Sequence, residues 1–209
     1  MTHVVSFISQ KGGVGKSTLA RALATECAKG GHKVKVADLD TQQSTFIDWH
    51  CQRLNNGKPR VGSVESYAKA QEAFQEATGF DVLIFDGAAR ASKATLEIAE
   101  KSDLAVLPTG ASRDDLIPAI ALANQLIKAG VLEQNLVFAL TRISTDAEGK
   151  EARAALEERG FKVLAGHLPD KAAYKQAQND GLAITETRFS SLNQKADELI
   201  EDLINFLSE

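Results

Sequence analysis

Residues 9–18 read SQKGGVGKST and overlap the end of the apolar run HVVSFIS of residues 3–9. A strand, a glycine-rich loop ending in Gly-Lys-Ser and a following helix form the pattern that binds nucleotide phosphates. Backbone N–H groups from Gly12 to Thr18 can converge on phosphate oxygens, and the helix dipole adds partial positive charge. A glycine-rich turn with incidental lysines is the alternative, but it does not explain why strand, loop and helix occur together. The stretch therefore predicts a phosphate-binding loop.

The loop suggests a role for each of its polar side chains. Lys16 is expected to reach the β- and γ-phosphates, Ser17 to place its hydroxyl on Mg²⁺, and Thr18 to donate to the α-phosphate. The usual pattern G-x-x-x-x-G-K-[ST] has its first glycine where Gln10 stands, and a second lysine, Lys11, lies inside the loop. The predicted phosphate-binding residues are Gly12, Gly13, Val14, Gly15, Lys16, Ser17 and Thr18.

Composition limits the classes of protein that remain. The chain has 209 residues, of which 44% are hydrophobic, and this fits a single α/β domain over residues 1–209. No apolar run approaches the length of a membrane span, and the first residues lack a signal-peptide pattern, so we expect a cytoplasmic protein. The net charge of -4 argues against coating a polyanion but allows a local basic patch. Both cysteines, Cys27 and Cys51, lie near apolar helical positions and are expected in the core.

Short apolar runs alternate with amphipathic stretches along the chain, as in repeated β-α units. The pattern predicts an α/β fold, a P-loop NTPase-like, mostly parallel twisted sheet with helices on both faces. The expected strands cover residues 3–9, 33–39, 80–86, 103–108, 136–141 and 162–168. The expected helices cover residues 16–29, 42–54, 65–77, 92–101, 114–129, 147–159, 171–179 and 190–208.

Carboxylates follow two of the expected strands, at the edge where ligands collect in open parallel sheets. Asp86 ends one strand and is interpreted as the Walker B carboxylate, which holds Mg²⁺ through water. Asp38 and Asp40 end another strand. Asp40 is interpreted as the group that orients or deprotonates the attacking water, and it joins Ser17 and Asp86 in the predicted metal site. Taken alone, each acid would be interpreted as a solvated strand end or a helix cap, and the neighbouring loop favours the catalytic interpretation instead.

The segments KGGVGKST (11–18), ADLDTQQS (37–44) and LIFDGAA (83–89) resemble the deviant Walker A ATPases of the ParA/MinD class. The resemblance is greatest to small ParA partition proteins that lack an N-terminal DNA-binding domain. It extends to residues 168–186, which are similar to the segment bordering the adenine pocket in that family. Thr41 stands where many ParA proteins have proline, which makes the first switch less rigid than in those relatives.

The resemblance implies a role for Lys11. In ParA-like proteins this lysine crosses a nucleotide-sandwich dimer and reaches the phosphates bound by the other subunit. It would therefore be both a nucleotide-binding and a catalytic residue, together with Lys16 and Asp40. A second ammonium favours such a dimer only when a triphosphate offsets the repulsion between the facing lysines. A solvent-facing lysine that only adds positive potential is the alternative.

The resemblance further implies ATP/ADP and Mg²⁺ as cofactors and slow hydrolysis, since the sequence shows no evident arginine finger. It implies an ATP-dependent homodimer, non-specific DNA binding, a ParB-like centromere-binding activator, and association with the nucleoid in the ATP-bound state. The expected base-pocket residues are Arg142, Pro169 and Asp170, and ordinary loop positions are the alternative. Basic positions considered for DNA are Lys171, Lys175, Arg188 and Lys195.

The C-terminal stretch distinguishes a membrane-binding protein from a DNA-binding one. Its apolar positions are spaced for one helix face, which can lie on a bilayer or pack on the domain. From Ser191 to Glu209 one lysine faces five acidic residues, so an anionic bilayer would repel this helix, and we expect packing and no membrane partner. The apolar positions are Leu192, Ala196, Leu199, Ile200, Leu203, Ile204 and Leu207.

Four other functions were considered, and the sequence argues against two of them. An iron-sulfur reductase would need cysteines after Asp86, and both cysteines precede it. A biosynthetic ligase on the same scaffold is possible in principle, but Lys11 argues against it. A positioning ATPase for a protein cargo and a regulatory adaptor that binds nucleotide without turnover both remain as alternatives.

Overall fold

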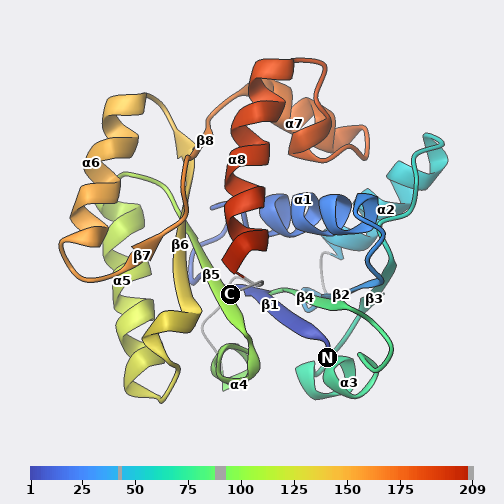
Figure 1. Ribbon diagram of the computed structural model, residues 1–209, viewed down its shortest axis with the longest axis horizontal. Helices are drawn as coiled ribbons and strands as arrows, with labels where there is room; N and C mark the ends of the chain where they lie inside the picture. The colour runs from blue at the N-terminus through green and yellow to red at the C-terminus, as the bar shows by residue number, and fades with distance from the viewer. Residues whose placement is uncertain (42–43, 88–92, 207–209) are drawn as a thin grey trace.

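The computed structural model describes residues 1–41, 44–87 and 93–206 (Figure 1). The strands are His3–Phe7 (β1), Val34–Asp38 (β2), Ser63–Ser66 (β3), Val82–Asp86 (β4), Leu104–Thr109 (β5), Leu136–Ile143 (β6), Lys162–Val163 (β7) and Leu168–Pro169 (β8). The helices are Lys16–Lys29 (α1), Thr45–Asn55 (α2), Ala70–Gln75 (α3), Lys93–Lys101 (α4), Arg113–Lys128 (α5), Asp146–Glu157 (α6), Ala172–Asn179 (α7) and Ser190–Phe206 (α8). Two short 3₁₀ helices cover Glu133–Asn135 (η1) and Ile184–Glu186 (η2).

The strands form one twisted sheet in the order β3-β2-β4-β1-β5-β6-β7, and β8 pairs with β6. Every strand pair is parallel. The central strands are buried along their whole length because helices cover both faces, and this explains their mostly apolar sequences. The predicted fold is confirmed.

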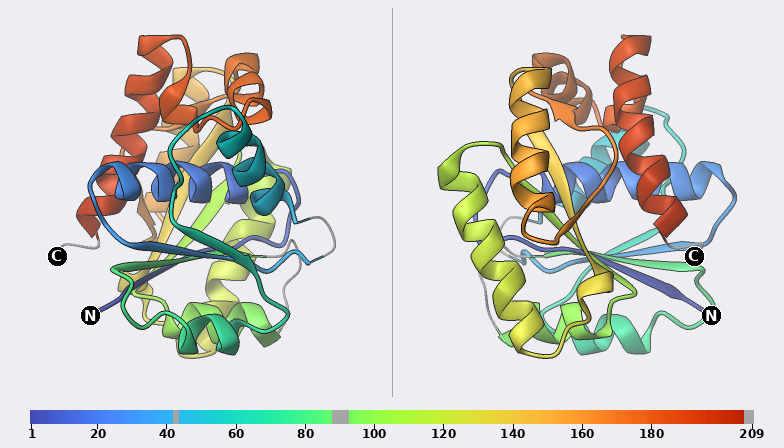
Figure 2. Two further views of the ribbon diagram at one scale, coloured as in Figure 1. Left: turned by 90° about the vertical axis from the view of Figure 1, so that its right-hand side faces the viewer. Right: turned by 60° about the vertical axis from the view of Figure 1, so that its left-hand side comes forward.

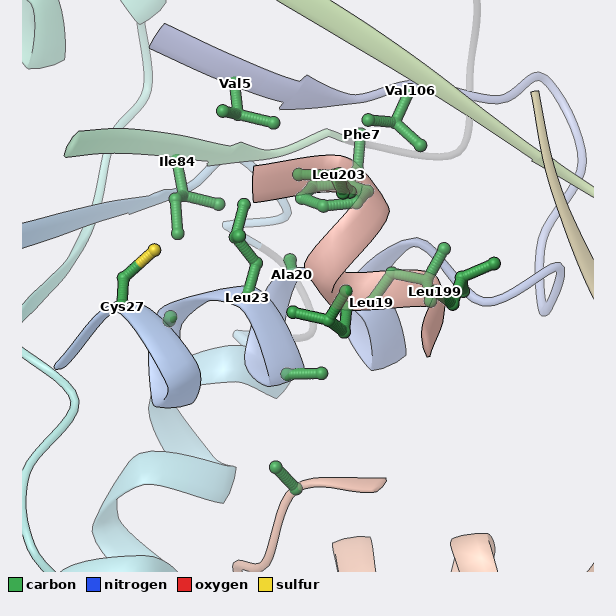
Figure 3. Close-up of a cluster of buried hydrophobic side chains, with 14 of the residues drawn as sticks. Val5, Phe7, Leu19, Ala20, Leu23, Cys27, Ile84, Val106, Leu199 and Leu203 are labelled. Carbon is green, nitrogen blue, oxygen red and sulfur yellow. The ribbon is translucent and has the colours of Figure 1, made fainter. Parts of the chain in front are cut away.

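Side chains that alternate along the strands separate the core into two layers. Val5 and Phe7 of β1 point toward α1 and α8, where they join a cluster with Leu19, Leu23 and Leu203 (Figure 3). The opposite face packs against α3, α4, α5 and α6 through two further clusters. The views in Figures 1 and 2 show α1, α2, α7 and α8 on one side of the sheet. The helix that begins at the phosphate-binding loop is therefore fixed between the sheet and α8.

The amphipathic C-terminal helix packs on the domain as predicted. Ala196, Leu199, Ile200 and Leu203 of α8 are buried in the same cluster as Leu19 of α1. Leu207 lies outside the described residues. Among the helices that the structure describes, none combines the length and the apolar character required to span a bilayer.

Three sequence predictions are wrong. The expected helix 65–77 begins only at Ala70, because residues 63–66 pair with β2 as the edge strand β3. The expected strand 162–168 is two short strands, because Arg153 takes the carbonyls of Val163, Leu164 and Gly166 out of the ladder. Cys27 is buried as expected, but Cys51 is exposed. The residues of α2 that face the core are Phe46, Trp49, His50 and Arg53.

Candidate functional site

The phosphate-binding loop connects the end of β1 to the start of α1. Gly13 and Gly15 adopt φ values of 73° and 103°, which side chains with a Cβ rarely adopt. A Cβ on Gly15 would also lie 3.3 Å from the methyl group of Thr141. Gly15 is the N-cap of α1, and among the described side chains none caps this end by a hydrogen bond. The first N–H groups of α1 thus face the loop as an anion-binding site.

Lys16 is held between the loop and the carboxylates behind it. Its residue is 8% exposed, and its Nζ lies 3.5 Å from the carbonyl oxygen of Lys11. Burial lowers the pKa of Lys16, while the charges of Asp86 and Asp40 act in the opposite direction. Both carboxylates therefore act electrostatically on Lys16.

Asp86 ends β4, the strand between β1 and β2, and is 3% exposed. The hydroxyl of Ser17 acts on its carboxylate to lower the pKa, and Oδ1 is buried with no partner among the described residues. Burial raises the pKa of Asp86 to about 6, and nearby Asp38 adds to the rise. A buried carboxylate oxygen beside a hydroxyl fits Mg²⁺, which binds through oxygen and relies on few protein ligands when phosphates complete its shell.

The two aspartates that end β2 have different roles. Asp38 is fully buried and accepts hydrogen bonds from the backbone N–H groups of Asp40 at 3.0 Å and Phe46 at 3.1 Å. It therefore caps the turn and the first residues of α2. Asp40 is partly exposed, and its charge acts on Lys16, so Asp40 is the acid of the pair that faces the loop. Gln42, next to this segment in the sequence, lies outside the described residues.

A cavity of about 190 Å³ opens beside the loop. Arg142 is in the left-handed backbone region with φ 57°, and its Nη1 lies 3.4 Å from the carbonyl oxygen of Gly13. The cavity thus brings the three predicted base-pocket residues Arg142, Pro169 and Asp170 next to the phosphate-binding loop. It is also lined by Gly13, Gly15, Thr18, Thr141, Leu168, Lys171, Tyr174, Lys175 and Gln178.

Sequence reasoning missed two side chains at this cavity. Thr141 donates to the carbonyl oxygen of Val14 at 2.6 Å, which ties the loop to β6. Gln178 donates to the hydroxyl of Thr18 at 3.2 Å from α7. The resemblance of residues 168–186 to an adenine-pocket segment was the signal that could have found Gln178.

Lys11 lies on the surface of the loop and is ion-paired with Asp115 in the first turn of α5. Its Nζ also lies 3.4 Å from the carbonyl oxygen of Asp114, and its side chain is 44% exposed. Burial alone would raise the pKa of Asp115, but hydrogen bonds from Lys11 and Ser112 outweigh it and lower this pKa. The partner of Lys11 within its own chain was not predicted from sequence.

The four basic candidates for DNA binding lie in different surroundings. Lys171 and Lys175 line the cavity beside the loop, and Lys175 is 3.6 Å from Asp170. Arg188 stacks on the ring of Phe189 at 4.8 Å. Lys195 is paired with Asp146 at 3.3 Å.

Comparisons with known proteins agree with this geometry. Residues 5–184 match the family model of the CobQ/CobB/MinD/ParA nucleotide binding domain (CbiA). The chain is 28% identical over 192 residues to the "Maintenance of carboxysome distribution protein A" of Gloeobacter kilaueensis, covering 89% of this chain and 85% of that protein. It is 26% identical over 177 residues to "Protein ParA" of Rhizobium radiobacter, covering 82% and 80%.

Solved structures of related proteins have the same fold. The MinD cell division protein of Aquifex aeolicus superposes with a TM-score of 0.75 at 18% identity, covering 98% of each chain. A plasmid partition protein of Borrelia burgdorferi bound to AMPPNP gives 0.73 at 14%, covering 98% of this chain and 99% of that one. At these sequence identities the superpositions show a shared fold and nothing further. With the family model matching most of its length, the chain belongs to the CobQ/CobB/MinD/ParA family of nucleotide-binding domains.

Proposed function

We propose that this protein is a ParA-type partition ATPase, in which ATP binding closes a dimer that binds DNA and hydrolysis releases it. The observation that carries the proposal is the convergence of Lys16, Ser17 and Asp86 at the start of α1, with Lys11 exposed beside them. Only this second lysine gives the loop a charge that can act outside its own subunit.

Each residue of the site has a role in phosphoryl transfer. Lys16 neutralises charge on the β- and γ-phosphates, and Ser17 with Asp86 holds Mg²⁺. Asp40 orients the attacking water or takes its proton. Lys11 of one subunit completes the charge around the phosphates of the other. Because such a site works by positioning and charge neutralisation, hydrolysis is expected to be slow until an activator completes it.

DNA binding in this proposal is non-specific and belongs to the dimer. With a net charge of -4, the contact must be local, and Lys171, Lys175, Arg188 and Lys195 are the positions proposed for it. A ParB-like centromere-binding protein would stimulate hydrolysis, and the ATP-bound form would gather on the nucleoid inside the cytoplasm.

Positioning of a protein cargo is the second candidate. It is supported by the 28% identity to a carboxysome distribution protein over 89% of this chain. The same ATP-dependent dimer serves both functions, and they differ in the activator and the cargo. A small DNA-binding gene and repeats beside this gene would favour plasmid partition. Turnover no higher than that of a Lys16→Ala control, with DNA and Mg²⁺ present, would instead favour a regulatory adaptor.

The first test is light scattering after size exclusion, with ADP and with a slowly hydrolysed ATP analogue. The same samples are then assayed for retention on DNA, with Lys16→Ala as the variant that cannot hold the phosphates. A dimer that forms only with the analogue, and that alone retains DNA, is the expected result. A monomer in both nucleotides that ignores DNA would contradict the partition function.

A further inference from the structure

Thr18, Gln178 and Arg21 form a chain of hydrogen bonds beside the nucleotide cavity. Nε2 of Gln178 lies 3.2 Å from the Thr18 hydroxyl, and Nη1 of Arg21 lies 2.9 Å from Oε1 of Gln178. Thr18 and Gln178 both line the cavity that contains Arg142. These hydrogen bonds therefore connect the cavity to the guanidinium of Arg21 on α1.

Arg21 fixes the direction of these hydrogen bonds. A guanidinium has only donors, so the oxygen of the Gln178 amide faces Arg21 and its NH₂ group faces Thr18. The Thr18 hydroxyl thus accepts from Gln178 and keeps its own proton for another acceptor. Donors in such a chain polarise one another, so Arg21 makes this hydroxyl a better donor toward the cavity. A charged phosphate oxygen would accept the strongest hydrogen bond from this hydroxyl.

Arg21 also holds the first turn of α2. Its Nη2 donates to the carbonyl oxygen of Thr45 at 2.5 Å, and its guanidinium lies 5.8 Å from the ring of Phe46 and 5.4 Å from that of Trp49. The helix α2 begins a few residues after Asp40. A change in the hydrogen bonds at Thr18 can therefore be transmitted through Arg21 to α2, the helix that follows Asp40.

A second set of contacts joins α2 to the segment after α7. Trp49 donates its indole N–H to the carbonyl oxygen of Leu182 at 3.2 Å, and Arg53 donates to that of Gly181 at 3.1 Å. Trp49 is the only tryptophan in the sequence. Its fluorescence therefore reports on the junction of α1, α2 and the segment after α7.

We propose that Gln178 is a positioning residue that sets Thr18 as a phosphate donor and transmits nucleotide occupancy through Arg21 to α2. This inference rests on the proposed function, because it takes the cavity to hold a nucleotide. The ligand class is a nucleoside di- or triphosphate, since the α-phosphate is common to both. Gln178 thus responds to any nucleotide in the cavity, diphosphate or triphosphate, whereas Lys11 responds to the triphosphate alone.

Two substitutions at Gln178 test the direction of the hydrogen bonds. Gln178→Ala removes the donor to Thr18 and is expected to weaken MgADP and MgATP-analogue binding about three- to tenfold. Gln178→Glu is expected to weaken both further, because a carboxylate only accepts and turns the Thr18 proton away from the cavity. Equilibrium dialysis measures both. Gln176→Ala and Gln176→Glu are matched controls, since Gln176 is exposed on the same helix and lines a different cavity.

Trp49 emission at saturating MgADP tests whether nucleotide binding is transmitted to α2, independently of any change in nucleotide affinity. The unaltered protein and Gln176→Ala are expected to show the same nucleotide-dependent change, and Gln178→Ala to lose most of it while fully bound. Thermal unfolding confirms that each variant is folded. Equal affinities for the Gln178 and Gln176 variants, or an undiminished Trp49 response in saturated Gln178→Ala, would overturn the inference and leave the proposed function standing. An unaltered protein that binds no nucleotide in dialysis would overturn both.

Discussion

The ammonium of Lys11 is paired with the carboxylate of Asp115 in its own chain, 104 residues further along the sequence. Asp115 is also held by Ser112, the N-cap of α5, so the partner of Lys11 is fixed to the helix start. A lysine that crosses to a second subunit must first leave this carboxylate. The pair therefore opposes the proposed dimer by the free energy of a partly exposed ion pair.

Asp115→Asn is expected to favour the ATP-dependent dimer. Asparagine keeps the size of the side chain and removes the charge that holds Lys11 in each subunit, so dimerisation should strengthen about two- to thirtyfold, the range for two exposed pairs. The measurement is the dimer dissociation constant with a slowly hydrolysed ATP analogue. Asp114→Asn is the matched control, because Asp114 lies in the same turn and its carbonyl, not its carboxylate, contacts Lys11. Equal effects of the two substitutions would show that the gain comes from net charge alone.

Lys11→Ala is expected to separate nucleotide binding from dimerisation. The residues that surround the phosphates within one subunit remain, so ATP binding should persist, while the dimer and its hydrolysis should be lost. Equilibrium dialysis and light scattering on the same preparation check the two properties. Normal ATP-dependent dimerisation in this variant would refute the role of Lys11 across the dimer.

The central strands were predictable from sequence because both of their faces are buried. Val34–Asp38 and Val82–Asp86 have no exposed side, so their residues are apolar apart from Lys35 and the terminal acids. The edge strand Ser63–Ser66 is polar and only partly buried. It is held by Lys35, whose Nζ lies 3.0 Å from Glu65 and 3.2 Å from Glu76. No local pattern encodes that tertiary contact.

Some residues of the candidate site were likewise predictable from sequence, and others were not. The phosphate-binding loop and Asp86 follow from local motifs, since the strand, loop and helix are adjacent in the sequence. Gln178 and Asp115 were not found, because each meets the loop only through folding of segments more than 100 residues away. Asp40 was assigned a catalytic role from the sequence, and Asp38 was assigned none. Only the position of α2 made Asp38 the buried cap.

Asp86→Asn is expected to stabilise the nucleotide-free protein and to abolish hydrolysis. Burial raises the pKa of Asp86 to about 6, so the folded state binds its proton more tightly than the unfolded state does. Stability should therefore fall as pH rises from about 4 to 6 and then stay level. At pH 7.5 without Mg²⁺ the variant should be more stable by roughly 1 to 2 kcal/mol, a gain that shrinks at pH 4.5. Urea unfolding at both pH values measures it, and equal gains at the two would contradict burial as the cause.

Arg53→Met is expected to destabilise the protein more than any surface charge change. Arg53 is 2% exposed and donates to Glu186 at 2.6 Å and to the carbonyl oxygens of Pro59 and Gly181. Its loss leaves the Glu186 carboxylate with only Lys29 at 3.5 Å and the N–H of Ala183, and it leaves two carbonyl oxygens without their donor, at a cost of about 3 kcal/mol. Glu186→Gln is the companion variant.

The pH dependence of the Arg53 and Glu186 pair follows from the carboxylate. Burial opposes ionisation of Glu186, but hydrogen bonds from Arg53 and from the N–H of Ala183 outweigh it and lower its pKa. The stability that the pair contributes should thus be complete above the ordinary glutamate pKa of about 4.3 and be lost as pH falls through the lower folded value. Urea unfolding of the unaltered protein and of Glu186→Gln should differ most at pH 7, and the difference should shrink as pH falls below about 4.3. A difference that does not shrink as the solution is acidified would mean that packing, and not the ion pair, supplies the stability.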